Sequence, residues 1–436
     1  MEHDRRSPYG CLTKRAGSPR DDRSPVVSAA NGRPGYGAPD PLRIVFSFPR
    51  GRGHLAPMLP LARAASAAGH RTALSGAREA VLEQTGFSHR QPRDVELPAS
   101  RPGTGTLTPI DPSTVLTRVP QVFLGDAAAG AVVDVGRLVT RWTADLVVCG
   151  EFDFGAMTAA ERAGVPCVVV LAFASAGGTW RDAVREPLEA LRRRAGLGPD
   201  PQQHMIGGAL TVIPFPASMR SGQELRGPVI RMRPDTWSSP PSDAAAWLTA
   251  GDGPRVYVTL GTEFNTKSGD LFARLIDALA ALPARILVTT GPWVDPTTFP
   301  VPAGPAAIRV EQYVPQDSVL GLVDLVVNHG GSGSVTGALA HGVPLLVLPL
   351  GADQLPNGGC VEALGAGLVL DAATATAKDI RTNASRLLTE PTFRVAAVRI
   401  RTEIATGEPP AVVLAAVERL VGRPPTRADE RLAATR

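Results

Sequence analysis

The sequence is poor in cysteine, lysine and aromatic residues, and these shortages exclude several classes of protein. Only four of the 436 residues are cysteines, and they form neither a CxxC pair nor a metal-ligand spacing. A disulfide-built scaffold and a cysteine-ligated zinc site are therefore excluded. Cys149 and Cys167 lie in apolar runs, which favours buried free thiols in a reducing compartment.

Long hydrophobic runs are also lacking. No apolar stretch reaches the length of about 18 residues that a membrane-spanning helix needs. The first residues carry charges where a signal peptide would have its apolar core. We therefore expect a cytoplasmic protein without an integral membrane segment.

The excess of basic residues is small and spread along the chain. Lysine and arginine number 45 against 41 acidic residues, for a formal net charge of +4. Only Lys14, Lys267 and Lys378 are lysines, and the one basic triplet, at 192–194, is typical of a solvated helix face. No concentrated basic surface is indicated, so we expect no nucleic-acid partner.

The length makes two domains the default. Residues 1–40 mix Arg, Asp, Pro, Gly and Ser without apolar periodicity, which predicts a disordered tail. From Leu42 onwards, LRIVFSF predicts a buried parallel strand, the following residues a helix that ends at Gly69, and HRTALSG a second strand. The arrangement recurs at 145–173, so residues 41–218 are expected to form a Rossmann-like domain.

The second half repeats this pattern after a change in composition. Residues 219–253 are rich in Pro, Ser and Gly, which predicts an interdomain linker. Strand and helix patterns then alternate over 254–405, which predicts a second Rossmann-like domain. Residues 406–422 indicate a C-terminal helix that is free to return to the first domain, and 423–436 a tail. The expected fold class is α/β, with two Rossmann-like domains facing a cleft.

The most informative segment is VDLVVNHGGSGSVTGALAHG, residues 323–342. Its apolar run ends at His329, a glycine-rich turn follows, and a helix is predicted from Val335 to Ala340. A strand, turn and helix in this order aim unpaired backbone N–H groups and a helix dipole at an anion. The spacing fits neither GxxxxGK[ST] nor GxGxxG. A tight turn without a ligand is the alternative, but the imidazole, the two hydroxyls and the later Asp353 and Gln354 favour a phosphate or pyrophosphate.

Three motifs together resemble the family 1 glycosyltransferases of the GT-B fold, in the bacterial branch that glycosylates macrolide, glycopeptide, enediyne and aromatic natural products. They are YVPQ (313–316), HGGSGS (329–334) and PLGADQ (349–354), and the likeness extends from about Leu42 to Leu420. The resemblance implies inverting, metal-independent transfer of a sugar from a dTDP or UDP donor to a hydroxyl of a lipophilic acceptor. No cofactor is expected, because the nucleotide-sugar is a co-substrate.

The resemblance places the donor diphosphate against the glycine-rich turn. The ring of His329 would lie against the diphosphate, and the backbone N–H groups and hydroxyls of Gly331, Ser332, Gly333 and Ser334 would act as donors. Thr262, at the end of RVYVTLGT, would make a second phosphate contact. Oriented donors stabilise the charge that grows on a departing nucleoside diphosphate, which removes the need for a metal. A helix-capping histidine and a simple turn threonine are the alternatives.

The other donor contacts are implied on either side of this turn. Tyr313 stands where many relatives have a tryptophan stacked on the pyrimidine, and the backbone around Val314 would pair with the base edge, with thymine or uracil left open. Asp353 and Gln354 resemble contacts to donor-sugar hydroxyls, since a carboxylate beside an amide suits vicinal diols. A core tyrosine and a solvated loop are the alternatives. Residues 336–337 are Thr-Gly where many relatives carry Gln-Glu or a His pair, so the donor sugar stays open.

His54, in GRGHLAP directly after the first strand, stands where the family places its general base. An imidazole can deprotonate an acceptor hydroxyl near neutral pH; a helix-terminal histidine is the alternative, and His70 is a weaker candidate. Several relatives orient this base with a carboxylate at the end of the strand corresponding to DLVVCG. This chain has Gly150 there. We expect Asp153 to be the partner, with Glu151 or no carboxylate as the alternatives.

Acceptor contacts are expected from residues 75–145 and 173–180, which are apolar and glycine-rich and therefore suit a hydrophobic small molecule. Three other functions stay open. They are a transferase acting on lipid or cell-wall intermediates, a nucleotide-sugar epimerase on the same fold, and a non-catalytic nucleotide-sugar-binding or partner-activating protein. The oligomeric state is also open, and a homodimer is allowed.

Overall fold

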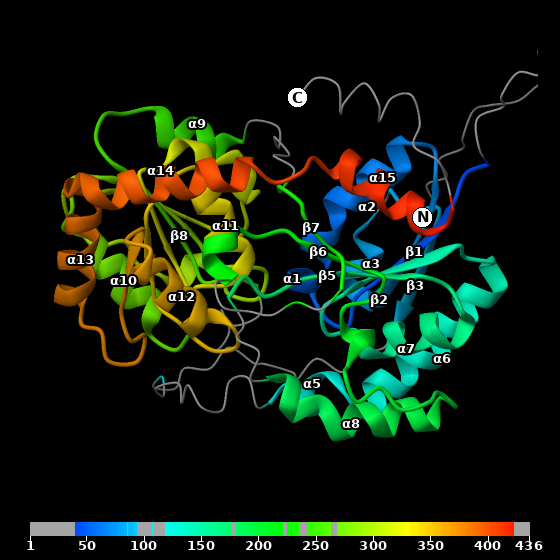
Figure 1. Ribbon diagram of the computed structural model, residues 1–436. Coiled ribbons are helices and arrows are strands. Elements are labelled where there is room, and N and C mark those ends of the chain that lie inside the picture. Colours follow the sequence, from blue (N-terminus) through cyan, green and yellow to red (C-terminus); the bar gives the residue numbers. More distant parts are fainter. Residues whose placement is uncertain are drawn as a thin grey trace, which may run out of the picture. The chain divides into compact units, whose positions relative to one another are not determined.

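The computed structural model describes residues 40–84, 86–93, 107, 118–175, 180–220, 225, 227–234, 242–262 and 268–422. The tails predicted at 1–40 and 423–436 lie outside the described residues, apart from Asp40. From Asp40 onwards the chain builds two parallel sheets with helices packed against them (Figure 1).

The first sheet has seven strands in the order β3-β2-β1-β4-β5-β6-β7. They are β1 (Arg43–Ser47), β2 (Arg71–Ala77), β3 (His89–Arg93), β4 (Leu146–Gly150), β5 (Cys167–Val170), β6 (Leu210–Ile213) and β7 (Val229–Arg231). In β4, Leu146 and Val148 enter one hydrophobic core, while Val147 and Cys149 enter another on the opposite face. Both faces are therefore covered, which explains why the central strands read as unbroken apolar runs.

The helices of this half follow the strands in the order typical of a doubly wound sheet. They are α1 (Arg52–Leu55), η1 (Ala56–Met58), α2 (Leu59–Ala67), α3 (Arg78–Leu82), α5 (Val119–Phe123), α6 (Asp126–Trp142), α7 (Phe154–Ala163), α8 (Trp180–Arg194), η2 (His204–Ile206) and η3 (Ala217–Arg220). The helix predicted before Gly69 is divided into α1, η1 and α2, with a proline in the first turn of the last two. Proline suits a first turn because the N–H it lacks would be unpaired there.

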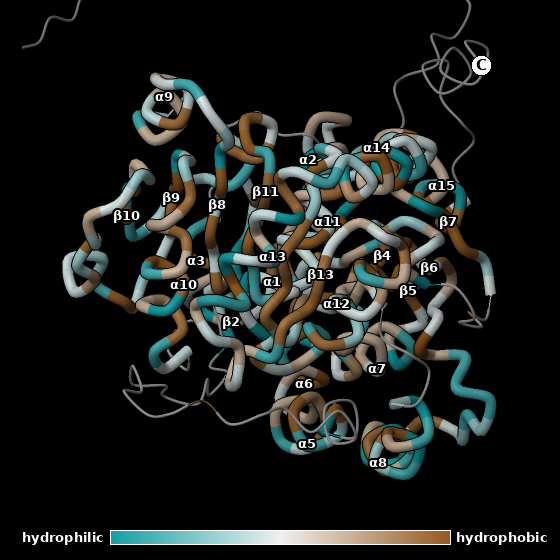
Figure 2. The backbone as a smooth tube through the Cα atoms, turned by 90° about the vertical axis from the view of Figure 1, so that its left-hand side faces the viewer, coloured by the Kyte–Doolittle hydropathy of each residue, from teal (hydrophilic) through white to brown (hydrophobic). Residues whose placement is uncertain are grey.

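The second sheet has six strands in the order β10-β9-β8-β11-β12-β13. They are β8 (Arg255–Thr259), β9 (Arg285–Thr289), β10 (Ala307–Glu311), β11 (Leu325–Asn328), β12 (Leu345–Val347) and β13 (Gly367–Val369). Its helices are α10 (Leu271–Ala280), η5 (Pro296–Thr298), η6 (Gln316–Ser318), η7 (Leu320–Leu322), α11 (Ser332–Ala340), α12 (Gln354–Ala363), α13 (Ala377–Thr389) and α14 (Pro391–Ala405). Figure 2 shows the hydrophobic character of β8, β9 and β11 along their length.

The residues predicted as a linker, 219–253, contain more regular structure than a linker does. Strand β7 pairs with β6 and extends the first sheet. Helix α9 (Asp243–Thr249) begins after Ser242, whose hydroxyl accepts a 3.2 Å hydrogen bond from the Ala245 N–H. An edge strand of three residues is too short to show a period, which is why the proline-rich composition dominated the prediction.

The C-terminal helix expected within residues 406–422 is present and returns to the first sheet. The residues after α14, around Gly407, are not helical. There the Glu408 N–H donates to the Arg231 carbonyl of β7 at 2.8 Å. Helix α15 (Pro410–Leu420) then packs against α2 (Figure 1), and its Val413 and Val417 share a hydrophobic core with Leu61. The C-terminal helix therefore completes the core of the first sheet.

In both sheets the strand order reverses next to the first strand of that half, β1 in one sheet and β8 in the other. Strand β1 pairs with β2 on one side and with β4 on the other, and β8 pairs with β9 and β11 in the same way. In open parallel sheets, ligands bind beyond the carboxyl ends of the strands at such a switch point. His54 follows β1 and Gly150 ends β4, while Gly261 follows β8 and His329 follows β11. The predicted acceptor and donor residues thus stand at the two switch points.

Candidate functional site

His54 lies in the short helix α1, and aromatic rings surround it. Its ring centroid is 5.2 Å from Phe123, 6.0 Å from Phe173 and 6.2 Å from Phe152. Burial among these rings lowers the pKa of His54 to about 4, the Arg50 charge acts in the same direction, and Asp153 opposes both. The imidazole is therefore neutral at physiological pH and can accept a proton.

Asp153 does not act as the hydrogen-bond partner of His54. Its carboxylate accepts from the Ser47 hydroxyl at 2.6 Å, from Arg93 Nη2 at 2.9 Å and from the Ala156 N–H at the start of α7 at 3.1 Å. The Nδ1 atom of His54 is buried without a partner among the described residues. The predicted pair of His54 and Asp153 is therefore not hydrogen-bonded in this structure, and Asp153 acts on the ring through its charge. Arg93, 60 residues earlier in the chain, donates to this carboxylate, and no local sequence pattern predicts that contact.

Glu151, the alternative partner, hydrogen-bonds to groups other than His54. One carboxylate oxygen accepts from the backbone N–H groups of Ala172 and Phe173, at 3.0 and 3.1 Å. Arg220 lies 3.5 Å from the other oxygen and donates to the Phe173 carbonyl. Glu151 and Arg220 together fix the segment 171–175 that follows β5.

The segment 171–175 links the surroundings of His54 to the second sheet. The Ala174 N–H donates to the Ser332 hydroxyl oxygen at 2.8 Å. The Ser175 hydroxyl donates to the Asn357 side chain at 2.6 Å. Since the ring of Phe173 lies against His54, one short segment contacts both the candidate base and the start of α11.

The glycine-rich turn contributes to α11 more than the sequence predicts. The helix begins at Ser332 and not at Val335, so the serines form its first turn. The N–H groups of Ser332, Gly333 and Ser334 have no hydrogen-bond acceptor in the described part of the chain, while the Val335 N–H donates to Gly331. Three unpaired N–H groups at the positive end of a helix form an anion site.

The ring of His329 is held between two glycines. A Cβ atom on Gly261 would lie 2.6 Å from the ring, and one on Gly331 would lie 2.5 Å from it. Burial lowers the pKa of His329 to about 4, against an opposing effect of the Thr259 backbone, and its Nδ1 is buried without a described partner. A neutral imidazole therefore stands beside the N-terminus of α11. Thr262, half-buried, follows Gly261 directly, so the two predicted phosphate contacts are close to each other.

The Ser332 hydroxyl is not available to a phosphate. It donates to Asp353 Oδ2 at 2.5 Å and accepts from Ala174 and from Asn357 Nδ2, the latter at 3.1 Å. The prediction of a hydroxyl donor at this residue is wrong, whereas the Ser332 N–H remains free. Ser334, one turn position later, keeps a half-buried hydroxyl without a hydrogen bond among the described residues.

Asp353 and Gln354 begin α12 at the edge of this site. Asp353 Oδ2 also accepts from Asn357 at 2.8 Å, and burial raises the pKa of Asp353 to about 6. Gln354 Oε1 accepts from the Leu350 and Gly351 N–H groups at 2.7 and 3.0 Å, while its NH₂ group donates no hydrogen bond to the described residues. Asn357 was missed in the sequence, although its spacing of four residues from Asp353 on a helix places the two on one face.

The predicted base-binding residues follow β10. The Tyr313 side chain is 59% exposed, so its face is open for stacking. Val314 is buried, and its backbone N–H and carbonyl make no hydrogen bond within the described residues. Two other side chains of nearby segments are polar or exposed: Gln316 has a buried Nε2 without a partner, and Trp293 is 60% exposed in a turn held by Gln312.

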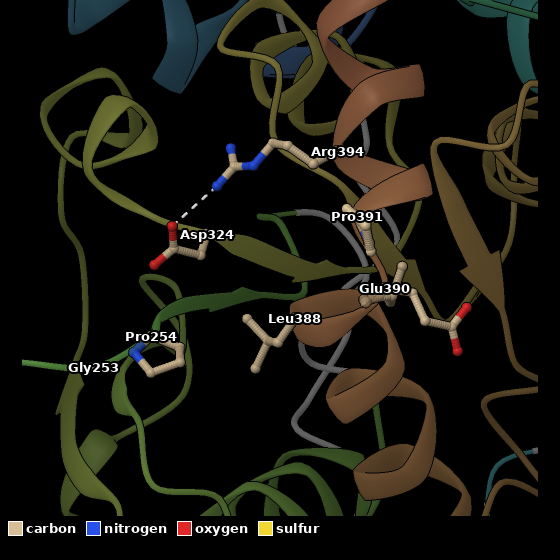
Figure 3. A pocket seen from close by; sticks show the side chains of 8 residues that line it. Gly253, Pro254, Asp324, Leu388, Glu390, Pro391 and Arg394 are labelled. Carbon is tan, nitrogen blue, oxygen red and sulfur yellow. Dashed lines mark hydrogen bonds and ion pairs between the residues drawn. The ribbon is translucent and has the colours of Figure 1, made fainter.

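A separate pocket lies at the other end of the second sheet. It measures about 250 Å³, and Figure 3 shows Pro254, Leu388 and Pro391 on its wall beside the 3.0 Å ion pair of Asp324 and Arg394. Pro254 precedes β8 and Asp324 precedes β11, so the pocket is at the amino ends of these strands. Parallel sheets bind their ligands at the carboxyl ends, and we assign no function to it.

Two searches of the described residues concern other classes of site. No group of three or more His, Cys, Asp and Glu side chains is placed to hold a metal ion. No helix there combines the length and apolar character needed to cross a bilayer.

Comparison with known proteins identifies relatives along most of the chain. Residues 273–420 match the family described as erythromycin biosynthesis protein CIII-like, C-terminal domain. The elloramycin glycosyltransferase ElmGT of Streptomyces olivaceus is 31% identical over 407 residues, which cover 86% of this chain and 97% of that protein. The 4'-demethylrebeccamycin synthase of Lentzea aerocolonigenes is 29% identical, over 83% and 96% of the two chains.

Solved structures agree with this comparison. The spinosyn forosaminyltransferase SpnP has a TM-score of 0.70 and 25% identity, covering 88% of this chain and 100% of that one. The glycosyltransferase VinC, solved in complex with dTDP, has a TM-score of 0.72 and 23% identity over the same shares. The predicted α/β fold class, with two parallel-sheet halves of the GT-B type, is confirmed.

The fold and the relatives define the chain as a glycosyltransferase. It belongs to the family 1 natural-product glycosyltransferases, as the identity to ElmGT over nearly the whole of both chains shows.

Proposed function

We propose that the protein transfers a sugar, with inversion at the anomeric carbon, from a nucleoside-diphosphate donor to a hydroxyl of a lipophilic small molecule. The observation that carries this proposal is the presence of a neutral histidine at each switch point. His54 follows β1 on the acceptor side, and His329 stands beside the free N–H groups of α11 on the donor side. A base on one sheet and a leaving-group site on the other allow the acceptor to attack the sugar from the side opposite the leaving diphosphate, in a single displacement step.

The reaction has one bond made and one broken. The acceptor oxygen attacks the anomeric carbon while its proton passes to Nε2 of His54. The bond from the anomeric carbon to the phosphate oxygen breaks, and its electron pair leaves with the nucleoside diphosphate. The protonated His54 then releases its proton to water, which restores the base.

The donor side is proposed to bind the nucleotide-sugar in three places. The N–H groups of 332–334, with His329 and Thr262, would bind the diphosphate. Tyr313 would stack on the base, and the free backbone groups of Val314 would pair with its edge. Asp353 and the NH₂ group of Gln354 would bind sugar hydroxyls. The dTDP complex of VinC supports dTDP as the first candidate nucleotide, with UDP as the alternative.

Charge on the leaving group is proposed to be stabilised without a metal or another cofactor. The N–H groups of residues 332–334 are oriented by the helix before the reaction starts, so they can stabilise the diphosphate without rearrangement. Addition of EDTA should therefore leave the rate unchanged within about twofold, and a rate restored only by Mg²⁺ or Mn²⁺ would contradict this part of the proposal.

A cytoplasmic location fits the thiols. Cys149, Cys167 and Cys360 are free cysteines, and the sulfur atoms of Cys149 and Cys167 lie 3.5 Å apart without a bond. Two thiols at this distance stay reduced where the compartment is reducing.

The deciding experiment measures binding and turnover separately. Thermal shift with dTDP, UDP and GDP should show stabilisation by dTDP or UDP, and failure of all three would contradict the donor site. Release of nucleoside diphosphate should then require an acceptor, and His54→Ala should lower it by about 10²–10⁴-fold. His204→Ala is a matched control because His204 is exposed. Turnover of the donor without acceptor would favour an epimerase, and nucleotide binding without transfer would favour a non-catalytic protein.

A further inference from the structure

The Nδ1 atom of His54 is buried without a hydrogen-bond acceptor among the described residues. A buried ring nitrogen is normally paired. A base that works through Nε2 carries its other proton on Nδ1, where a carboxylate would orient the ring and stabilise the imidazolium that forms. Among the described residues no side chain accepts from Nδ1, and Asp153 acts on the ring only through space.

Both nearby carboxylates are neutralised by other groups. Asp153 is held by Ser47, the Ala156 N–H and the buried guanidinium of Arg93. Glu151 is held by two backbone N–H groups and lies beside Arg220. Each carboxylate therefore has a buried cation of its own, and neither can supply the acceptor that Nδ1 lacks.

Gly150, at the end of β4, lies close to the backbone of His54. A Cβ atom placed on it would lie 3.8 Å from the His54 carbonyl and 3.6 Å from Pro49, which is ordinary van der Waals contact. Its backbone does not have a positive φ. Space and conformation both allow a larger residue, so the absence of a carboxylate here is not a steric necessity.

Arg50 is a cation whose charge acts on His54. Arg50, half-buried at the end of the β1 turn, makes no hydrogen bond or ion pair in the part of the chain that the structure describes. Its charge acts on His54, together with burial, to lower the pKa of that ring. A positive charge beside a weak base favours an acceptor oxygen that carries negative charge early in the reaction.

The rings around His54 indicate what kind of molecule carries that oxygen. Phe123 and Phe152 stack with centroids 4.9 Å apart, and Phe173, at 4.7 Å from Phe152, is the half-buried member of the group. No charged side chain of α5, of the β4–α7 turn or of the segment 171–175 hydrogen-bonds to His54. Among the described residues, Arg50 and Asp153 are the charged groups that act on it through space. Phe152 is fully buried and Phe123 nearly so, which leaves Phe173 as the ring that an acceptor can contact. A flat aromatic molecule packs well against such a ring.

We infer that the acceptor is a phenol, and that aliphatic alcohols of the same size are poor acceptors. The inference rests on the proposed function and specifies its substrate class. A phenol loses its proton at a pKa of about 10, against about 15.7 for water, so an unassisted imidazole can remove it. The phenol O–H proton passes to His54 Nε2, the oxygen bonds to the anomeric carbon, and the nucleoside diphosphate leaves with the electron pair of the broken bond. Arg50 stabilises the phenolate character of the attacking oxygen.

The first test compares two acceptors of matched shape. Nucleoside diphosphate release is measured with 1-naphthol and with 1-decalol, its saturated counterpart, using dTDP-glucose and UDP-glucose as donors. We expect 1-naphthol to react at least about 10²-fold faster. In a series of para-substituted phenols the rate should fall steeply as the hydroxyl becomes less acidic.

The second test supplies the missing carboxylate. Gly150→Asp should raise the rate with 1-decalol by about tenfold or more and flatten the dependence on phenol acidity, because His54 gains an anionic partner. Gly150→Asn is the matched control, with the same shape and no charge, and should change the ratio of the two rates by less than about threefold. Thermal unfolding of both variants confirms that they are folded, and Arg50→Gln should lower the 1-naphthol rate more than the 1-decalol rate.

The outcomes separate the inference from the proposed function. Comparable rates with 1-naphthol and 1-decalol in the wild-type protein would overturn the inference and leave the proposed function intact. Transfer to neither acceptor nor to any substituted phenol would overturn both. If Gly150→Asp does not fold, the acceptor comparison and the Arg50→Gln variant still decide the question.

Discussion

The hydroxyl of Ser332 lies 2.5 Å from Oδ2 of Asp353, 21 residues further along the chain. This hydrogen bond joins the first turn of α11 to the start of α12, so the anion site and the proposed sugar contacts form one unit. The same hydroxyl accepts from Ala174 in the segment that follows β5. The Ser332 hydroxyl therefore connects the anion site and Asp353 to the segment 171–175 that contacts His54.

Replacing Asp353 with asparagine should stabilise the protein near neutral pH. Burial raises the pKa of Asp353 from its ordinary 3.8 to about 6, so its contribution to stability is fully present below pH 3.8 and is lost as the pH rises through 6. At pH 7.5 the ionised carboxylate costs about 3 kcal/mol. Asp353→Asn should recover about 1–3 kcal/mol in urea denaturation at pH 7.5, and less at pH 5.

The same variant should lose activity if Asp353 binds the donor sugar. We expect KM for the nucleotide-sugar to rise by about tenfold, since a hydrogen bond to a charged group contributes about 1.5–3 kcal/mol. A less stable protein at pH 7.5, or unchanged donor kinetics, would argue against the respective part of this prediction.

Acid should destabilise the protein through His329. Burial lowers the pKa of His329 from 6.5 to about 4, so its contribution is present above pH 6.5 and is lost as the pH falls through 4. His54 acts in the same direction, whereas Asp353 acts in the opposite one between pH 3.8 and 6. Comparison with His329→Gln isolates one group. The difference in unfolding free energy between wild type and variant should shift by about 2 kcal/mol in favour of the variant from pH 7 to pH 5. A pH-independent difference would show that His329 titrates normally.

A methyl group on Gly261 should disturb the diphosphate site from beneath the His329 ring. Gly261 has a φ of +74°, and the added Cβ would lie 2.6 Å from the ring. Gly261→Ala should therefore cost about 2–4 kcal/mol of stability and weaken dTDP binding in titration calorimetry. Gly359→Ala in α12 is the control, because no atom lies within 4 Å of its Cβ position and alanine favours a helix. Equal effects of the two variants on dTDP affinity would contradict the proposed contact.

The C-terminal helix should depend on a buried hydrogen bond to the first domain. His70 Nδ1 accepts from the Leu42 N–H at 3.2 Å, and its Nε2 lies 2.7 Å from Glu418 of α15. His70→Ala leaves the Glu418 carboxylate unpaired and should cost about 1–3 kcal/mol. Proteolysis should then cleave α15 faster than in the wild type or in His204→Ala. Unchanged cleavage would show that the apolar contacts of Val413 and Val417 hold the helix alone.

Much of the fold was predictable because local patterns dominate in parallel sheets. Apolar runs such as LVVCG stay apolar throughout when both faces are covered, and glycines mark the turns that follow them. Strand β7 was missed because three residues at a sheet edge show no period. The start of α11 was placed three residues late, since Ser332, Gly333 and Ser334 have low intrinsic helix propensity and only the surrounding contacts make them helical.

The candidate site divides in the same way. The sequence by itself determined the types of residue at the strand ends, His54 and His329 among them, because strand, turn and helix follow one another in order along the chain. Only the tertiary structure decided which polar groups are free. Arg93 donates a hydrogen bond to Asp153, Arg220 lies beside Glu151, and the Ala174 N–H donates to the Ser332 hydroxyl. Each contact joins residues 60 or more positions apart in the chain. A buried polar group bonds to whatever the packing brings within reach, and that choice depends on contacts that no local pattern records.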